Sequence, residues 1–231
     1  MPIKALFFDL DGTLADMESS VEAAFDEAYA LVTRYHPQLQ KRDFRSKFDA
    51  TLRISVEAEM RGLPQYVSRR DRFRETLRRL GYPDNPLADR LADVYGAVRL
   101  SSLALYPDAA VTLDDLYLKK ALGLVTNGPA AVQRGQIQAL ELDKYFQHIL
   151  VSEEVGYSKP HPEIFRRALE LAEVTREEAL FVGDTPETDI AGAQQVGMQT
   201  AWLNRRERRW PANLPEPDHS IASLQELLSL V

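Results

Sequence analysis

The sequence contains no cysteine, so disulfides, thiolate nucleophiles and zinc–sulfur sites are excluded. It also lacks a basic and apolar leader at its amino terminus. No stretch approaches the ~18 consecutive apolar residues that a membrane-crossing helix needs. We therefore expect a cytoplasmic protein with no membrane partner.

The sequence motifs of several common enzyme classes are missing too. The chain has no G-x-S-x-G nucleophile elbow, no G-x-G-x-x-G pattern and no Walker A pattern. Without cysteine, a His–Cys pair for acyl transfer is impossible. The histidines show no metal-ligand spacing, and we interpret all of them as structural or surface residues: His36, His148, His161 and His219.

Charge is plentiful but unevenly distributed. The 231 residues have a formal net charge of −7, which argues against general nucleic-acid binding. Between Arg34 and Arg79, 13 Lys/Arg stand against 6 Asp/Glu, so this segment carries +7 and the rest of the chain −14. Such a segment is consistent with attracting an anionic substrate, although solvated helix faces are the commoner explanation. We interpret the run Arg205–Arg209 as a surface loop rather than a binding motif.

The most informative segment is an apolar run near the amino terminus that stops at two acids. Residues Ile3–Phe8 predict a buried strand, followed by Asp9, Asp11 and a turn at Gly12. Carboxylates this close repel each other unless a cation bridges them. The carboxyl end of such a strand is also where open α/β sheets bind ligands. On its own, the segment is as consistent with an acidic turn as with a metal site.

From about residue 104 onward, strand and helix patterns alternate. This predicts an α/β fold with a Rossmann-like, doubly wound parallel sheet. Residues 16–103 have a helical, amphipathic pattern instead, and we predict that they form an inserted all-α helical bundle. The core domain is then 1–15 with 104–231; two domains in series would leave the first strand without a sheet. The later strands are expected at Ala121–Thr126, His148–Ser152, Ala179–Asp184, Gln199–Leu203 and His219–Ile221.

Polar residues follow the predicted strands, and a parallel sheet brings such positions to one crevice. Taken singly, each has an ordinary explanation as a turn residue or helix cap. Together they favour phosphoryl transfer, because acids hold Mg²⁺ and a lysine and a hydroxyl bind phosphate oxygens. One aspartate can then attack phosphorus while another moves the proton. The residues beyond the first acidic pair are Thr126, Asn127, Lys159, Asp184 and Asp189.

With these residues the sequence resembles the haloacid dehalogenase-like hydrolases, specifically the phosphatase branch of subclass I, which carries a helical cap. Four motifs occur in the family's order, and the resemblance covers residues 1–15 and 104–231. It implies that Asp9 is the nucleophile and a magnesium ligand. It also implies that Asp11 is the general acid/base and offers its backbone carbonyl to the metal. The motifs are Asp9–Leu14, Val125–Gly128, Ser158–Phe165 and Gly183–Ile190.

The same resemblance implies the remaining roles. Thr126 and Lys159 bind phosphate, with Asn127 beside them. Asp184 ligates magnesium, and Asp189 supports the metal site through water or through the lysine. The implied activity is that of a Mg²⁺-dependent phosphatase, which hydrolyses small phosphorylated metabolites through an aspartyl-phosphate on the nucleophile.

Four alternatives stay open. A 2-haloacid dehalogenase is disfavoured because the dehalogenases of this family lack the acid that Asp11 provides. A sugar phosphomutase shares all core motifs. A pyrimidine or nucleoside 5′-monophosphate nucleotidase is suggested by the stretches Val151–Gly156 and Ala201–Asn204, which resemble bacterial members of that kind. A non-catalytic binding module is disfavoured by the complete catalytic set.

The resemblance implies that the cap selects the substrate, but the cap has no comparable motif. Arg45, Lys47 and Arg53 are candidates for contacting a second anionic group of a small phosphorylated substrate. The oligomeric state is left open between monomer and homodimer.

Overall fold

The computed structural model describes residues 2–60, 68–83 and 86–231, without the side chains of residues 55–60. Its contacts divide the chain into two compact units. Unit 1 comprises Met1–Met17 and Ala104–Val231, and unit 2 comprises Glu18–Leu103. The chain therefore leaves unit 1 shortly after its first strand and returns to it after four helices.

Unit 1 contains a six-stranded parallel sheet in the order β3-β2-β1-β4-β5-β6. The first strand lies in the middle, paired with β2 on one side and β4 on the other. Every residue of β1 is buried, as expected for a parallel strand that is covered on both faces. The strands are β1 (Ala5–Phe8), β2 (Ala121–Thr126), β3 (His148–Val151), β4 (Ala179–Gly183), β5 (Gln199–Leu203) and β6 (His219–Ile221).

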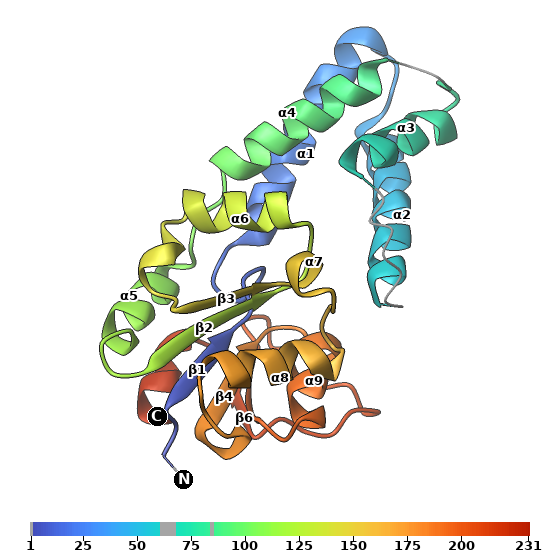
Figure 1. The fold of residues 1–231 in the computed structure, drawn as a ribbon. Helices are drawn as coiled ribbons and strands as arrows, with labels where there is room; N and C mark the ends of the chain where they lie inside the picture. The colour runs from blue at the N-terminus through green and yellow to red at the C-terminus, as the bar shows by residue number, and fades with distance from the viewer. Residues whose placement is uncertain (1, 61–67, 84–85) are drawn as a thin grey trace. The chain divides into compact units, whose positions relative to one another are not determined.

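Helices cover both faces of this sheet. Helix α6 lies on one face, and α8 and α9 lie on the other (Figure 1). The chain runs outward from β1 to β3 and then crosses to β4 on the opposite side of β1, so the strand order reverses at β1. Ligand crevices of open α/β sheets lie at such a reversal. The helices of unit 1 are α5 (Pro107–Leu116), α6 (Ala130–Ala139), α7 (Ser152–Val155), α8 (Pro162–Leu171) and α9 (Ala191–Gln195). Short helical turns span η1 (Leu142–Lys144), η2 (Arg176–Glu178), η3 (Pro186–Ile190) and η4 (Leu224–Ser229).

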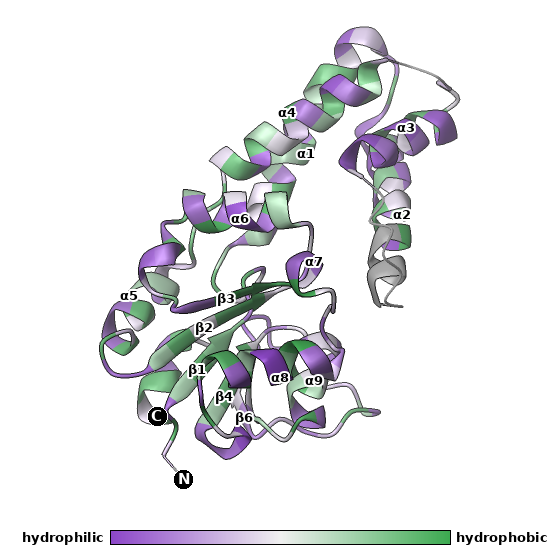
Figure 2. Cartoon of the chain, in the orientation of Figure 1, coloured by the Kyte–Doolittle hydropathy of each residue, from purple (hydrophilic) through white to green (hydrophobic). Residues whose placement is uncertain are grey.

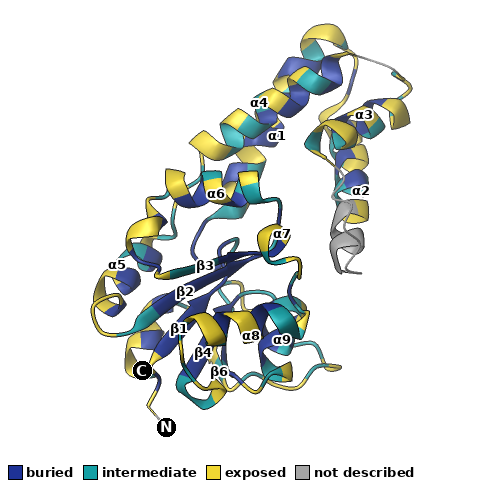
Figure 3. Cartoon of the chain, viewed as in Figure 1, coloured by how far each residue is buried: buried dark blue, intermediate teal, exposed yellow. Residues whose placement is uncertain are grey.

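Helix α8 shows how the sequence determines one of these layers. Pro162 occupies its first turn, where the missing N–H costs no helical hydrogen bond. Ile164, Phe165 and Ala168 form its buried face, and the Phe165 ring packs edge-on against Phe181 of β4 at 5.1 Å between centroids. The strands are accordingly mostly hydrophobic in Figure 2 and mostly buried in Figure 3. The helices carry hydrophobic, buried residues on one face and hydrophilic, exposed residues on the other.

Unit 2 consists of helices around an aromatic core. Phe48 packs against Phe73 and Phe73 against Tyr95, with ring centroids 5.3 and 5.6 Å apart. Phe25 and Phe44 extend this cluster, and all five rings are buried. The helices are α1 (Met17–Tyr35), α2 (Lys41–Met60), α3 (Arg69–Arg79) and α4 (Leu87–Ser101).

The predicted α/β class with a Rossmann-like parallel sheet is confirmed. β2, β5 and β6 have the predicted bounds, and the other three strands differ from the predictions by one or two residues. β1 begins at Ala5 rather than Ile3, because the Lys4 amide bonds the Glu178 carbonyl outside β4. Ser152 begins α7, and Asp184 follows β4 instead of belonging to it. Among the described residues we find no helix with the length and apolarity that a bilayer crossing requires.

Candidate active site

Polar side chains gather where the central strands of the sheet end. Asp9 follows β1, Thr126 is the last residue of β2, and Asp184 follows β4. Because β1 pairs with both β2 and β4, these positions are neighbours at the carboxyl edge of the sheet. Lys159, just before α8, and Asp189, in η3, join them there.

The acids form a compact cluster around one lysine. Asp9, Asp184 and Asp189 each offer a carboxylate oxygen within 4.8 Å of the others. The ammonium of Lys159 lies 2.6 Å from Asp9 Oδ1 and 2.8 Å from Asp189 Oδ1. Asp9, Lys159 and Asp189 are all buried, so water screens these charges poorly. The lysine compensates only part of the negative charge.

The environment of the cluster changes the acidity of its members. Burial raises the pKa of Asp9 well above its usual value, and the neighbouring aspartates add to this while Lys159 opposes it. Burial, helped by the Asp189 charge, raises the pKa of Asp184 to about 6. Burial would lower the pKa of Lys159, but Asp189 and Asp9 outweigh it, so its pKa is raised. The lysine is therefore charged at neutral pH, and the acids retain excess negative charge that a cation would stabilise.

This donor set fits a hard divalent cation. It offers oxygen ligands only, close enough together to share one ion, in a buried and negatively charged place. Asp189 already accepts from Lys159 and from the Thr185 amide at 3.0 Å. Asp9 pairs with Lys159 through one oxygen, and the contacts of Asp184 are longer, 3.1 Å from the Thr185 hydroxyl and 3.5 Å from Arg208. Both oxygens of Asp189 accept at 3.0 Å or less, so Asp9 and Asp184 are the side chains best placed to hold the ion.

Gly12 allows the first motif to approach Asp184. Its φ is +90°, a conformation that other residues rarely adopt. A Cβ at this position would lie 3.0 Å from Asp184 Cγ. Glycine thus lets the turn after Asp11 pack directly against an acid of the cluster.

Asp11 lies beside the cluster and accepts a hydrogen bond from Gln133, a residue that the sequence did not point to. The Gln133 side chain, on α6, donates to Asp11 Oδ2 at 3.3 Å and accepts from the Thr126 hydroxyl at 2.9 Å. Gln133 is buried and therefore links the predicted proton-transfer acid to the predicted phosphate-binding hydroxyl. No local pattern marks it, because a glutamine on the inner face of a helix has no sequence signature of its own.

Asn127 contacts the backbone of Lys159. Its amide nitrogen donates to the Lys159 carbonyl at 2.9 Å, and its side-chain oxygen accepts from the Lys159 N–H at 2.8 Å. The two bonds fix the loop that carries the lysine. In the structure, Asn127 therefore orients a phosphate-binding candidate.

The arginine run is more than a surface loop. Arg208 donates to the Asp184 carbonyl at 2.6 Å and lies 3.5 Å from its carboxylate. Arg205 forms a two-point ion pair with Asp108, at 2.8 and 2.9 Å, and donates to the Thr13 carbonyl at 3.2 Å. Residues 206–209 are exposed and lie outside helices and strands, in agreement with the predicted surface loop. The charge pattern gave no sign that two of its members turn back to the segments carrying the acids.

The three basic residues predicted to contact a second anionic group lie on α2 of unit 2. Arg45 stacks on the Phe25 ring at 3.5 Å and pairs with Glu22, so its charge is already matched. Lys47 and Arg53 are exposed. Their role in substrate binding stays a prediction.

A model of the haloacid dehalogenase-like hydrolase family matches residues 3–197. The chain belongs to this family. The match spans all four motifs and unit 2, and it confirms the predicted membership and the assignment as an enzyme of a hydrolase family.

Relatives of similar length carry phosphatase names. The glyceraldehyde 3-phosphate phosphatase of Pyrococcus furiosus is 36% identical, over 87% of this chain and 80% of its own. The glyceraldehyde 3-phosphate phosphatase of Pyrococcus abyssi is 32% identical, over 99% and 94%. The pyrimidine 5′-nucleotidase YjjG of Escherichia coli is 29% identical, over 98% and 96%.

Solved structures of the family share the whole fold. The HAD-hydrolase YfnB of Bacillus subtilis, described as bound to magnesium, superposes with a TM-score of 0.79 at 25% identity over 100% of this chain and 99% of its own. A 2-haloacid dehalogenase of Pseudomonas syringae pv. Tomato superposes with a TM-score of 0.71 at 31% identity, over 99% and 97%. The HAD phosphatase of Thermococcus onnurineus superposes with a TM-score of 0.67 at 29% identity, over 99% and 97%. The fold is therefore shared by a phosphatase and a dehalogenase, and the choice between them depends on the site.

Proposed function

We propose that this chain is a Mg²⁺-dependent phosphomonoesterase that hydrolyses small phosphorylated metabolites through an aspartyl-phosphate on Asp9. The observation that carries the proposal is the buried cluster in which Lys159 lies between Asp9 and Asp189. A carboxylate oxygen of Asp184 lies within 4.8 Å of an oxygen of each of these two acids. A second acid, Asp11, lies next to it and is held by Gln133. Relatives named as phosphatases support the same class of reaction.

In the first half of the reaction, an Asp9 carboxylate oxygen attacks the phosphorus atom of the ester. The bond between phosphorus and the leaving oxygen breaks, and Asp11 gives its proton to that oxygen, so an alcohol departs. Gln133 directs Asp11 by donating to one of its oxygens. Lys159 and the Thr126 hydroxyl bind phosphate oxygens and stabilise the charge that develops on them.

In the second half, water attacks the phosphorus atom of the aspartyl-phosphate, and Asp11 takes the proton of that water. The bond from phosphorus to Asp9 breaks, which restores the carboxylate and releases inorganic phosphate. Mg²⁺, held by Asp9, Asp184 and the Asp11 backbone carbonyl, would supply positive charge against the phosphate oxygens. Asp189 keeps Lys159 in place.

Asp11 is the reason to prefer a phosphatase to a dehalogenase. Cleavage of an ester needs a proton for the leaving oxygen, and a halide ion needs none. A proton donor held beside the nucleophile therefore favours esters, even though a structural relative is a dehalogenase. A sugar phosphomutase uses the same acid. It differs from a phosphatase in the second step, where a sugar hydroxyl instead of water accepts the phosphoryl group.

A nucleoside monophosphate is the second substrate class to consider. A relative named as a pyrimidine 5′-nucleotidase covers 98% of this chain at 29% identity. The relatives named after glyceraldehyde 3-phosphate have identities of 32 and 36%. We therefore rank small phosphorylated metabolites first and nucleotides second, and we assign residues 16–103 the role of the substrate-selecting cap.

The test is hydrolysis of a chromogenic phosphate ester by the wild type and by Asp9→Asn. We expect Mg²⁺-dependent release of phosphate by the wild type and a loss of at least about a thousandfold in kcat in the variant, because the nucleophile is gone. A panel of phosphorylated sugars, phosphorylated acids and nucleoside monophosphates then ranks the substrates.

Activity that survives Asp9→Asn, or that persists after EDTA treatment, would refute the proposal. Transfer of phosphate between two positions of a sugar without its release would identify a mutase. Release of halide from a 2-haloacid would identify a dehalogenase.

A further inference from the structure

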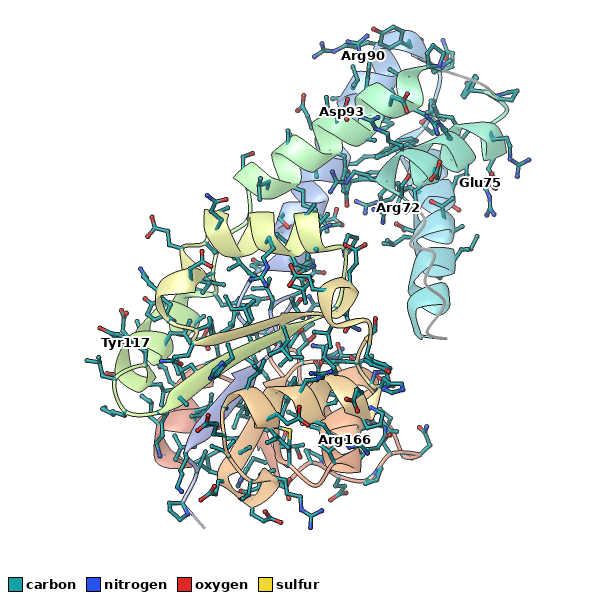
Figure 4. All side chains as sticks on the ribbon, viewed as in Figure 1. Arg72, Glu75, Arg90, Asp93, Tyr117 and Arg166 are labelled. Atoms are coloured by element: carbon teal, nitrogen blue, oxygen red, sulfur yellow. The ribbon has the colours of Figure 1, made fainter. Side chains whose placement is uncertain are left out.

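Several exposed arginines of unit 1 pair with acids on the surface of the molecule. Arg166, labelled on α8 in Figure 4, lies 3.5 Å from Glu163 of the same helix. Arg134 of α6 lies 2.6 Å from Glu154 of α7. Pairs between solvated side chains of this kind contribute little to stability. Arg208, in the loop after β5, differs from them because its acidic partner belongs to the candidate active site.

Arg208 contacts Asp184 at two places. One of its Nη atoms donates to the Asp184 carbonyl at 2.6 Å, and the same atom lies 3.5 Å from the carboxylate oxygen Oδ2. The other carboxylate oxygen, Oδ1, accepts from the Thr185 hydroxyl at 3.1 Å. Oδ2 is therefore the oxygen of Asp184 that a positive charge of the chain itself approaches.

The loop holds the backbone of Arg208 through bonds that do not involve Asp184. The Asn204 side chain donates to the Arg208 carbonyl and accepts from the Arg208 N–H, both at 2.9 Å. Trp210 packs edge-on against Trp202 of β5, with ring centroids 5.0 Å apart. The backbone is thus fixed, whereas the Arg208 side chain is 45% exposed. Its guanidinium can turn into water without disturbing the loop.

The backbone of Asp184 does not depend on Arg208 either. The indole N–H of Trp202 donates to the same Asp184 carbonyl at 3.0 Å. Trp202 is buried, so this bond persists when the arginine moves or is replaced. What Arg208 adds to the site is therefore a positive charge beside the Asp184 carboxylate.

That charge lies next to a cluster with an excess of acids. Asp9, Asp184 and Asp189 offer oxygens within 4.8 Å of one another, and Lys159 pairs with the first and the last of them. A divalent cation on these oxygens and a guanidinium beside them repel each other, although both are attracted by the same carboxylate. Lys159 is buried and cannot turn into water, so Arg208 is the cation that gives way.

We propose that Arg208 competes with the divalent cation for the Asp184 carboxylate and so sets the Mg²⁺ concentration at which the site fills, which rests on the magnesium site of the proposed function. In the metal-free protein, Arg208 compensates the charge of Asp184. When the ion binds, the guanidinium turns away from the carboxylate. Arg208 acts on the metal through Asp184 and touches neither the substrate nor the reacting atoms.

The test measures Mg²⁺ binding to the metal-free full chain by titration calorimetry, without any phosphate ester. Arg208→Met removes the charge and keeps most of the length of the side chain. Arg209→Met is the matched control, because Arg209 is exposed in the same loop and its loss changes the net charge equally. The titrations are made at about pH 8, where the Asp184 carboxyl, whose pKa is about 6, is ionised.

We expect Arg208→Met to bind Mg²⁺ about fivefold or more tightly than the wild type, because a competing ion pair is lost. Arg209→Met keeps the affinity of the wild type. Arg208→Lys retains the charge, so its affinity lies closer to that of the wild type than to that of Arg208→Met. The gain in Arg208→Met shrinks as KCl is added, since salt screens an exposed guanidinium. A role of Arg208 in shaping the loop alone would produce neither the rescue by lysine nor the salt dependence.

Equal Mg²⁺ affinities of Arg208→Met and Arg209→Met, or weaker binding by Arg208→Met, would overturn the proposal and leave the proposed function in place. Asp184→Asn separates this case from a failure of the proposed function. If Asp184→Asn binds Mg²⁺ as tightly as the wild type, the ion binds elsewhere. The assignment of Asp184 as a metal ligand and the role of Arg208 are then both refuted.

Discussion

Side chains at the centre of unit 1 have pKa values that differ from those in water. Asp184 has a pKa of about 6 because it is buried beside Asp189. Lys159 stays charged because it lies between Asp9 and Asp189. As the pH falls through about 6, the Asp184 carboxyl therefore takes up a proton, which a divalent cation has to displace.

From this we predict that Mg²⁺ binding weakens as the pH falls through about 6. Below that pH the metal-free protein carries a proton on Asp184, and above it the carboxylate is free to bind. Titration calorimetry between pH 5 and 8 should show an affinity that falls up to about tenfold per pH unit on the acidic side. An affinity that is independent of pH across this range would contradict the assignment of Asp184 as a ligand.

The raised pKa of Asp184 also makes the stability of the metal-free protein depend on pH. A carboxyl whose pKa is 3.8 unfolded and about 6 folded stabilises the folded state at low pH. This contribution is lost as the pH rises through about 6. Urea titrations in EDTA should therefore show a lower free energy of unfolding at pH 7 than at pH 5, and Asp184→Asn should reduce that difference, to which Asp9 also contributes.

A separate prediction concerns Gln133, which bonds both Thr126 and Asp11. Gln133→Ala leaves Asp11 free to rotate away from the leaving oxygen, so we expect kcat to fall about 10- to 100-fold, as for other residues that orient catalytic groups. KM for a chromogenic ester should change little. Gln133→Glu is the stricter variant, because it keeps the shape but places a negative charge beside Asp11. Unchanged kcat in both variants would show that Gln133 has no positioning role.

At the scale of elements, one ion pair joins three segments of unit 1. Asp108 at the start of α5 accepts from Arg205 after β5, and also from the Ser223 hydroxyl and the Leu224 amide at the start of η4. Arg205 in turn donates to the carbonyl of Thr13, directly after the first motif. Through Arg205, the carboxyl-terminal part of the chain is thereby bonded to the turn that follows Asp9 and Asp11.

We predict that Asp108→Asn lowers the free energy of unfolding by about 2 kcal/mol at pH 7, because it weakens several charge-assisted hydrogen bonds. Burial alone would raise the pKa of Asp108, but hydrogen bonds from Arg205, Leu224 and Ser223 lower it. Its contribution is therefore present above about pH 4 and disappears as the pH falls below the unfolded value. Denaturant titrations from pH 3 to 7 test this, and a difference between the variant and the wild type that persists undiminished at pH 3 would contradict it.

The elements that the sequence predicts well are those with a strong local pattern. Apolar runs identify the strands, and the acids directly after them identify the sheet edge, because a parallel sheet places all its carboxyl ends together. Gln133 and Asp108 cannot be predicted in this way. Their importance comes from partners that are 122 and 97 residues away in the chain, Asp11 and Arg205, and no local pattern encodes such a contact.

The arginines show the same limit at the residue level. Composition identifies a basic segment between Arg34 and Arg79. It does not distinguish Arg74, which pairs with Asp89, from Arg72, whose Nε atom is buried with no hydrogen-bond partner. Only the packing of α3 against α4 separates the two.

At the scale of the whole molecule, the chain forms two units, and the candidate catalytic residues all belong to unit 1. A ligand of the acidic cluster therefore stabilises the unit built from both ends of the chain. Unit 2 has its own aromatic core and its own charge pattern. Binding events in the two units can be separated experimentally by the ligand used.

We accordingly predict that Mg²⁺ raises the melting temperature of the wild type. At a hundredfold excess over Kd the ligand adds about 2.7 kcal/mol, or roughly 5–10 °C for a chain of this size. Asp184→Asn should abolish most of this rise, whereas Arg74→Met should keep it, because its side chain belongs to unit 2. An equal rise in Asp184→Asn would show that the ion binds elsewhere.

The most direct test of the central claim is detection of the phosphoryl group on Asp9. Asp11→Asn should form the aspartyl-phosphate and hydrolyse it slowly, since the variant lacks the base that activates water. After mixing with Mg²⁺ and a chromogenic phosphate ester, acid quenching and peptide mass spectrometry should find the added phosphoryl on the peptide containing Asp9, and not in Asp9→Asn. Steady release of phosphate with no phosphorylated Asp9 at any quench time would contradict the account.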